Sequence, residues 1–187
     1  SASADETHHI HNRTAGDIPY LLVLERKTGQ TLWRANADGL ANDQQLGITA
    51  SSLQSEPGEF PAAIYHSLKN GLTGCGLLES EADAMIQTWW TSYFESDGLR
   101  VFWILPESAT ERILPLTVNP SPKKTVRVIV GRSEVLRPRQ EAEWLAESKL
   151  TGDEAARWRY TREQHRFGLA ITERVTALQS TTATAPK

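Results

Sequence analysis

Cysteine, methionine and long apolar runs are all scarce in this chain of 187 residues. The single cysteine, Cys75, excludes an internal disulfide and a zinc site built on several thiolates. No apolar run approaches the roughly 20 residues that a membrane-spanning helix requires. Positive charge is not in excess either, because 20 Lys and Arg side chains stand against 23 Asp and Glu, for a net charge of −3. A nucleic-acid surface and a polybasic membrane anchor are therefore both disfavoured.

The common sequence motifs of catalysis and cofactor binding are missing as well. There is no Gly-x-Ser-x-Gly elbow, no Gly-x-x-x-x-Gly-Lys-Ser/Thr loop, no His-Glu-x-x-His and no Gly-x-Gly-x-x-Gly. On this basis we assign no catalytic, cofactor-binding or metal-binding residue and no cofactor. A hydrolase with residues dispersed along the chain stays open as an alternative, because spatial neighbours are invisible in a sequence. Its candidates are His66, Cys75, Ser92 and His165.

Large aromatic side chains are present in number: six Trp, four Tyr and four Phe, enough to supply a hydrophobic core. Strand-like runs occupy residues 20–25, 30–35, 99–105 and 125–136, and Gly29 suits a tight turn between the first two. Helix-like patterns occupy residues 60–73, 81–94, 138–149 and 151–178. These patterns predict an α+β fold with a small, mainly antiparallel sheet of about four strands, covered by helices and followed by a long C-terminal helix.

The polar ends of the chain set the predicted domain limits. Residues 1–17 lack periodicity and are expected to form a flexible N-terminal arm, and residues 179–187 a disordered tail. Residues 18–178 are expected to form one α+β domain, with a long loop at 36–58. Gly168, inside the expected last helix, is unfavourable there by about 1 kcal/mol and marks a place of close packing.

Two polar clusters have simple structural explanations. Ser80, Glu81 and Asp83 suit the beginning of a helix, with Ser80 as its cap, so we do not read the acids as an acid–base pair. His8 and His9, with His11, could reach a common metal ion on an extended segment, but closed sites usually need four ligands. A solvated tail is the simpler interpretation, and metal binding there stays open.

An aromatic and basic cluster in the middle of the chain is the predicted partner-binding surface. Neighbouring positions on a helix are about 100° apart, so one of Trp89 and Trp90 should lie at the edge of the core. Exposed Trp and Arg side chains are typical of protein interfaces. The residues assigned to this surface are Trp89, Trp90, Trp103, Arg100, Arg127 and Arg132.

The same central block resembles a family of exported bacterial proteins. The resemblance rests on Gly76-Leu77-Leu78-Glu79-Ser80-Glu81-Ala82 with Met85, Thr88-Trp89, Ser92 and Phe94, on Gly98-Leu99-Arg100-Val101-Phe102, on Ile113-Leu114-Pro115-Leu116 with Asn119-Pro120, on Arg127-Val128-Ile129-Val130-Gly131-Arg132, and on His165-Arg166-Phe167-Gly168. It covers about half the chain, and Cys75 and Trp90 depart from its pattern. It implies a setting outside the cytoplasm and transfers no catalytic residue.

The function predicted from these observations is a non-enzymatic, exported interaction domain. We expect an accessory or structural subunit of a cell-envelope or membrane-associated complex, with protein partners, no nucleic acid and no transmembrane segment of its own. A periplasmic or otherwise extracytoplasmic location is expected, because the small residues Ser1-Ala2-Ser3-Ala4 resemble the start of a chain trimmed by signal peptidase. A segment cut out of a longer chain is the alternative explanation of this start, and it stays open. A small-ligand-binding domain that uses the Trp cluster is a further alternative.

Overall fold

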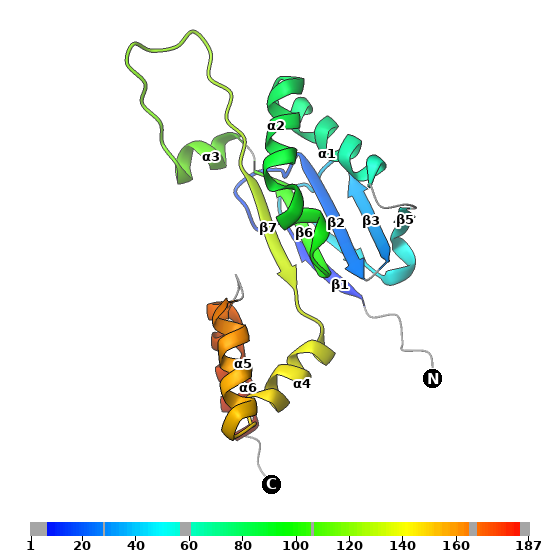
Figure 1. The fold of residues 1–187 in the computed structure, drawn as a ribbon. Coiled ribbons are helices and arrows are strands. Elements are labelled where there is room, and N and C mark those ends of the chain that lie inside the picture. The colour runs from blue at the N-terminus through cyan, green and yellow to red at the C-terminus, as the bar shows by residue number, and fades with distance from the viewer. Residues whose placement is uncertain (1–6, 28, 57–60, 106, 165–167, 184–187) are drawn as a thin grey trace. The chain divides into compact units, whose positions relative to one another are not determined.

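The structure, a computed structural model, describes residues 7–27, 29–56, 61–105, 107–164 and 168–183 (Figure 1). The chain divides into two compact units, Ser1–Val135 and Leu136–Lys187. We call the first the sheet unit and the second the helical unit. The boundary between the two units lies inside the single domain expected over residues 18–178, and the number of domains stays a prediction.

A five-stranded antiparallel sheet forms the centre of the sheet unit. Its strands, in spatial order, are β5 (Gln54–Glu56), β3 (Gln30–Asn36), β2 (Tyr20–Lys27), β6 (Gly98–Ile104) and β7 (Val130–Val135). A second antiparallel sheet pairs β1 (His8–His11) with β4 (Gln45–Ile48). The α+β class and the antiparallel pairing are confirmed. The expected number of about four strands was too small, because the polar segments 1–17 and 36–58 also contribute strands.

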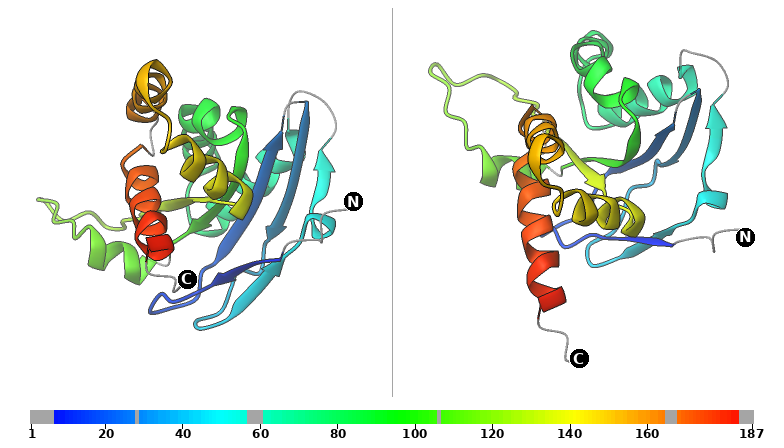
Figure 2. Two further views of the ribbon diagram at one scale, coloured as in Figure 1. Left: turned by 90° about the horizontal axis from the view of Figure 1, so that it is seen from below. Right: turned by 60° about the horizontal axis from the view of Figure 1, so that its bottom comes forward.

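Helices cover one face of the larger sheet (Figures 1 and 2). They are α1 (Ala62–Gly74) and α2 (Glu79–Trp90), the second followed by a π-helical turn, η2 (Thr91–Glu95). A short 3₁₀ turn, η1 (Ala50–Ser52), and α3 (Glu107–Ile113) complete the helices of this unit. The helix α2 begins two residues earlier than expected, and the Leu78 amide, not Ser80, closes its first turn by donating to Glu81 Oε2 at 2.8 Å.

Alternation along β2 explains why the sheet unit has two cores. Tyr20, Leu22 and Leu24 are buried against the helices, while Leu21 and Val23 are buried on the opposite face. Successive side chains of a strand point to opposite faces, so a strand that is apolar at every position is covered on both sides. The second core includes Ile48 of β4, which places the small sheet over the face that the helices leave uncovered.

Two glycines of this unit lie beneath aromatic rings. A Cβ on Gly71 would lie 2.6 Å from the Tyr20 ring, and a Cβ on Gly131 would lie 2.2 Å from the Trp103 indole. Trp103 and Gly131 are direct cross-strand partners on β6 and β7. Cross-strand neighbours on one face are the closest side chains in a sheet, so the large indole takes the space that the glycine leaves.

The helical unit contains α4 (Pro138–Glu147), α5 (Gly152–Gln164) and α6 (Gly168–Ala183). The long helix expected from 151 to 178 is not confirmed, because the structure has two helices there, with residues 165–167 outside the described part. Gly168 begins α6, and a Cβ on it would lie 2.1 Å from the carbonyl oxygen of Arg162. The close approach inferred for Gly168 is therefore one between the start of α6 and the backbone of α5. The helix α6 also runs five residues, 179–183, into the segment expected to be a disordered tail.

Among the residues that the structure describes, no helix has the length and apolar character needed to cross a membrane.

Candidate interaction site

The two adjacent tryptophans of α2 have different environments. Trp89 is 47% exposed, and its indole stacks on Tyr93 with 6.0 Å between ring centroids. Trp90 is half-buried against the helix-side core. Its ring centroid lies 4.7 Å from that of Phe94 and 6.1 Å from that of Tyr65. Trp89 is therefore the member of the pair that lies at the surface, while Trp90 extends the core.

Trp103, the third predicted tryptophan, lies on the other face of the sheet. It is half-buried and packs against the second core, over Gly131. Its neighbour in sequence, Phe102, belongs to the helix-side core. Trp103 is therefore separated from Trp89 and Trp90 by the sheet itself, and the aromatic cluster seen in the sequence is divided between two faces.

Arg100 is a buried structural residue. It is 1% exposed, and its guanidinium donates to the carbonyl oxygens of Tyr93 at 2.9 Å and Asp97 at 2.8 Å. Its Nε also faces Glu134 Oε2 at 3.4 Å. Cations suit the carbonyl end of a helix, so Arg100 stabilises the turn that follows α2 rather than offering a charge to a partner.

Arg132, on β7, also binds the turn that follows α2. Its Nε donates to Glu134 Oε1 at 2.7 Å, and its Nη1 donates to the carbonyl oxygen of Ser92. The guanidinium carbon lies 5.8 Å from the centroid of the Tyr93 ring. Arg132 is therefore engaged in contacts within the fold. The Tyr93 ring beside it also stacks on the exposed Trp89.

Arg127, the last of the predicted partner-binding residues, lies in the long segment that connects β6 with β7. Its Nη1 donates to Glu111 Oε1 of α3 at 2.8 Å. We call residues 107–129 the β6–β7 arm; it projects from the sheet in all three views (Figures 1 and 2). At its base the Leu105 amide donates to the Ile129 carbonyl oxygen at 2.9 Å, which prolongs the pairing of β6 with β7. A Cβ on Gly76 would lie 3.2 Å from Val126 Cγ1, so the base is also packed against the turn between α1 and α2.

Large aliphatic side chains are exposed together on this arm. Ile113, Leu114, Leu116 and Val118 lie within six residues, and each exposes between 44% and 58% of its surface. Single exposed apolar residues are ordinary, whereas a contiguous set marks a contact surface. The sequence patterns did not predict this exposed apolar segment.

The same part of the arm has unused hydrogen-bonding groups. Residues 115–118 belong to no strand or helix, and we find no hydrogen bond from them to another described residue. Leu114, Leu116 and Val118 alternate with Pro115 and Thr117, which is the spacing of side chains along one face of an extended strand. The arm therefore offers both apolar side chains and free backbone groups.

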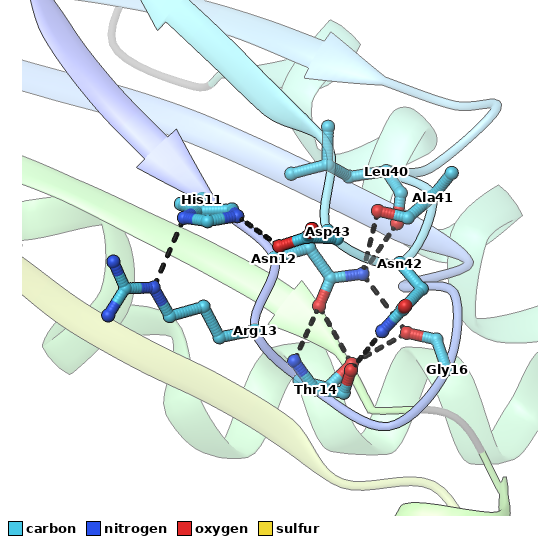
Figure 3. Close-up of polar contacts among 9 residues, drawn as sticks. All are labelled: His11, Asn12, Arg13, Thr14, Gly16, Leu40, Ala41, Asn42 and Asp43. Atoms are coloured by element: carbon cyan, nitrogen blue, oxygen red, sulfur yellow. Dashed lines mark hydrogen bonds and ion pairs between the residues drawn. The ribbon is translucent and has the colours of Figure 1, made fainter.

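Polar side chains gather elsewhere, where the first strand meets the loop that precedes β4 (Figure 3). The buried Asn12 amide donates to the carbonyl oxygens of Leu40 at 2.8 Å, Gly16 at 3.0 Å and Ala41 at 3.1 Å. Its oxygen accepts from the Thr14 amide at 2.9 Å and the Thr14 hydroxyl at 2.7 Å. Every polar atom of Asn12 is thus used, and residues 12–16 are held to the rest of the unit. This differs from the flexible arm expected over residues 1–17.

His11 lies at the edge of this cluster, and both its ring nitrogens are engaged. Arg13 Nε donates to Nδ1 at 3.1 Å, which requires Nδ1 to be an acceptor. Nε2 lies 2.8 Å from Asp43 Oδ1 and therefore donates to it. A metal ion at His11 would have to displace one of these contacts. Among the described residues, no group of three or more His, Cys, Asp or Glu is placed to hold a metal ion.

Asp83 lies between the two helices of the sheet unit. It accepts a hydrogen bond from the Tyr65 hydroxyl and one from Lys69 Nζ at 2.9 Å, and these contacts lower the pKa of the carboxyl. The same contact with Asp83 raises the pKa of Tyr65 and that of Lys69. Asp83 thus fastens α2 to α1 and is an ionised carboxylate at neutral pH. It does not cap α2, which is where the sequence placed it.

The residues suggested for a dispersed hydrolase have separate surroundings. Burial raises the pKa of the Cys75 thiol, which favours the thiol over the nucleophilic thiolate. The Ser92 hydroxyl donates to the Trp89 carbonyl oxygen at 3.0 Å. His66 is exposed and meets the edge of the Tyr65 ring. His165, the fourth of them, lies outside the described residues.

Comparisons with known proteins leave the family open. No family model matches the chain, and no solved structure matches it. The chain is similar to a non-reducing polyketide synthase of Gibberella zeae, with 32% identity over 103 residues. That similarity covers 53% of this chain and 4% of the synthase, so the chain spans a small fraction of the length of that protein.

Proposed function

We propose that this chain is a non-enzymatic interaction domain that binds a protein partner through its β6–β7 arm. The observation that carries the proposal is the exposure of four large aliphatic side chains within residues 113–118. Burying each of them in a partner would contribute about 1–2 kcal/mol, since each is about half exposed in the free chain. Four such anchors together match the scale of a small interface hot spot.

The arm is well suited to binding because its backbone is already restricted. Three prolines, Pro115, Pro120 and Pro122, fix φ at their positions, and the Arg127–Glu111 ion pair holds the base. Association costs less free energy when the bound conformation is already ordered. The arm therefore needs little further ordering to present its apolar side chains.

Charge on the arm indicates the chemistry of the partner. Between Ile113 and Ile129 the chain has Lys123, Lys124 and Arg127 and no acidic residue, although the whole chain has a net charge of −3. The complementary surface is an apolar groove or open sheet edge with acidic residues at its rim. A lipid bilayer fits less well, because free backbone groups of an irregular segment are not tolerated in hydrocarbon and the arm lacks interfacial aromatic residues.

The resemblance to exported bacterial proteins supports a proposal about the place of this domain in the cell. On that ground we propose an accessory or structural subunit of a cell-envelope or membrane-associated complex. An arm that is apolar and unprotected is easier to retain in a chain whose partner covers it permanently. Cell fractionation of the native source tests the location, and recovery in the cytoplasmic fraction would contradict it.

Site-specific photocrosslinking in the native source tests the arm directly. A photoreactive residue at position 116 should give a covalent adduct with one defined protein. The matched control has the same residue at position 160, because Tyr160 is also well exposed but lies in the helical unit. Equal adducts from both positions, or none at 116, would contradict the proposal.

A variant with Leu114→Ser, Leu116→Ser and Val118→Ser refines the test. These side chains are not in either core, so the free energy of unfolding should change by only about 0.5 kcal/mol per site. Affinity for the crosslinked protein should fall by about 100-fold or more, since three partly buried anchors are lost. The control Lys123→Ser should lower affinity by less than about 10-fold.

A further inference from the structure

We propose that the helical unit binds a small aromatic carboxylate in a cavity between α4, α5 and α6. The cavity has a volume of about 390 Å³. Small-molecule sites usually have volumes of about 300–1,000 Å³, so this one suits a ligand with one or two fused rings. It uses no residue of the β6–β7 arm, and the proposal is independent of the proposed function.

The walls of the cavity are aromatic and aliphatic. Each of the three helices contributes one apolar side chain: Trp144 from α4, Trp158 from α5 and Ile171 from α6. Two indoles facing one cavity provide flat apolar surfaces against which a planar ring can stack. A planar hydrophobic ring is therefore the natural occupant.

Two arginines from α5 supply the charge. The Arg162 guanidinium carbon lies 4.2 Å from the centroid of the Trp158 ring, and Arg157 lines the same cavity. Neither guanidinium has an ion pair with a carboxylate among the residues that the structure describes. A guanidinium that lies over an indole ring can still donate its N–H groups to a carboxylate, which a guanidinium binds through two hydrogen bonds.

Glu147 also lines the cavity and narrows the range of ligands. With Arg157 and Arg162, the three charged groups sum to +1, which favours a ligand with one negative charge over a dianion or a cation. Gln140 adds an uncharged polar group at the wall. The ligand class is thus a monoanionic aromatic carboxylate.

The three helices around the cavity are held together by contacts that use none of the side chains lining it. Arg174 of α6 binds both oxygens of Glu141 on α4, at 2.5 Å and 2.9 Å. Gln179 Nε2 donates to Ser148 Oγ at 3.0 Å. Gly168 lets the start of α6 approach the carbonyl of Arg162. These contacts hold α6 against its neighbours without using the residues that would contact the ligand.

Titration of the full-length chain with 1-naphthoate tests this site, with calorimetry and two-dimensional NMR of the indole N–H groups as readouts. We expect saturable binding with a Kd of about 1 mM or tighter, given about 0.3 kcal/mol per ligand atom. The signals of Trp144 and Trp158 should shift, and that of Trp89 should not. The neutral isostere 1-naphthamide should bind about 10-fold more weakly or worse, because it lacks the charge-assisted contact.

Single substitutions separate the ligand contact from the fold. Arg162→Gln should weaken 1-naphthoate binding by about 10- to 100-fold, the range for one charge-assisted hydrogen bond. Arg139→Gln is the matched control, because Arg139 is an exposed arginine of the same unit that does not line the cavity; it should leave the Kd unchanged. Arg157→Gln provides a second variant if Arg162→Gln loses helicity.

Several results would overturn the proposal. These are the absence of saturable binding, equal affinity for 1-naphthamide, equal effects of Arg139→Gln and Arg162→Gln, or ligand-induced shifts confined to the tryptophans of the sheet unit. Loss of the arm's crosslinked partner would leave this result unaffected, so the two proposals can fail separately.

Discussion

The sheet unit and the helical unit differ in how much of each is buried. Among the described residues, all the buried hydrophobic side chains of the sheet unit except Ala109 belong to two cores, one on each face of the sheet, whereas the buried hydrophobic side chains of the helical unit are only Ile171 and Val175. The helix α5 has no buried residue over the part whose side chains the structure describes, 152–163. Small units hide a small share of their surface and are marginally stable. The comparison teaches that the sheet unit supplies stability and the helical unit has room for a ligand.

Removal of the Phe102 ring should have the largest effect on this contrast. Phe102 is fully buried, with its ring centroid 4.8 Å from that of Tyr93 and 6.1 Å from that of Phe94. Phe102→Ala should lower the free energy of unfolding of the sheet unit by about 3–5 kcal/mol, because it leaves a cavity. Denaturant unfolding followed by NMR of the six indole groups checks this. Equal early loss of the Trp144 and Trp158 signals would break the distinction between the units.

Arg100→Met should follow, with a loss of about 2–3 kcal/mol. The substitution keeps most of the side-chain volume but removes the N–H groups that donate to the carbonyl oxygens of Tyr93 and Asp97. Thermal unfolding of both variants compares Arg100→Met with Arg139→Met, whose arginine is exposed on α4. A change as small as that of the control would show that Arg100 is not the structural residue described above.

High pH should weaken the sheet unit through Tyr20. Burial raises the pKa of Tyr20 from 10.0 to about 12, and its hydroxyl lies 2.9 Å from Ser67 Oγ. Because the folded state favours the neutral phenol, its contribution is complete below pH 10 and is lost as pH rises toward 12. The loss is about 3 kcal/mol at most, at 1.36 kcal/mol per unit. Tyr20→Phe should flatten the stability profile over that interval, and an unchanged slope would contradict the assignment.

A smaller effect is expected in the helical unit. Val175→Ala removes two buried carbons, each contributing about 0.8 kcal/mol, for a loss of about 1–2 kcal/mol. The loss should be visible in the Trp144 and Trp158 signals at denaturant concentrations where Trp33 and Trp103 remain unchanged. Simultaneous loss of all signals would mean that the two units unfold together.

The smallest effect belongs to the β6–β7 arm. Leu116→Ser should change the free energy of unfolding by no more than about 0.5 kcal/mol, since the side chain is half exposed and packs in neither core. Equilibrium urea unfolding of the isolated chain measures this. A loss above about 2 kcal/mol would show that the arm supports the fold, and so could not be kept free for a partner.

Sequence patterns predicted the parts of the fold that depend on local alternation. The hairpin around Gly29, with φ of 75°, and the central strand at 98–104 are both confirmed. The strands β1 and β4 escaped prediction because their pairing depends on backbone hydrogen bonds between polar segments. The division of the expected 151–178 helix into α5 and α6 escaped it because a helical pattern does not record where one helix ends and the next begins.

The six residues predicted to form one partner-binding surface lie in different places in the fold, for a reason that strand β6 contains. Arg100 has the same parity as Phe102 and Ile104 on β6, so it must point toward the helix-side core. Trp103 has the opposite parity and points to the other face. Alternation applied to the cluster would have separated these residues. The exposure of residues 113–118, in contrast, depends on a projection of the chain that no periodicity reveals.

The glycines beneath the aromatic rings limit which substitutions this sequence can accept during evolution. Gly131 under Trp103 and Gly71 under Tyr20 leave no space for a β-carbon. Either glycine can be replaced by a larger residue only if the aromatic residue above it is replaced by a smaller one. The two members of each pair should therefore change together. Homologues with low overall sequence identity should still be recognisable by these two coupled pairs of positions, Gly71 with Tyr20 and Gly131 with Trp103.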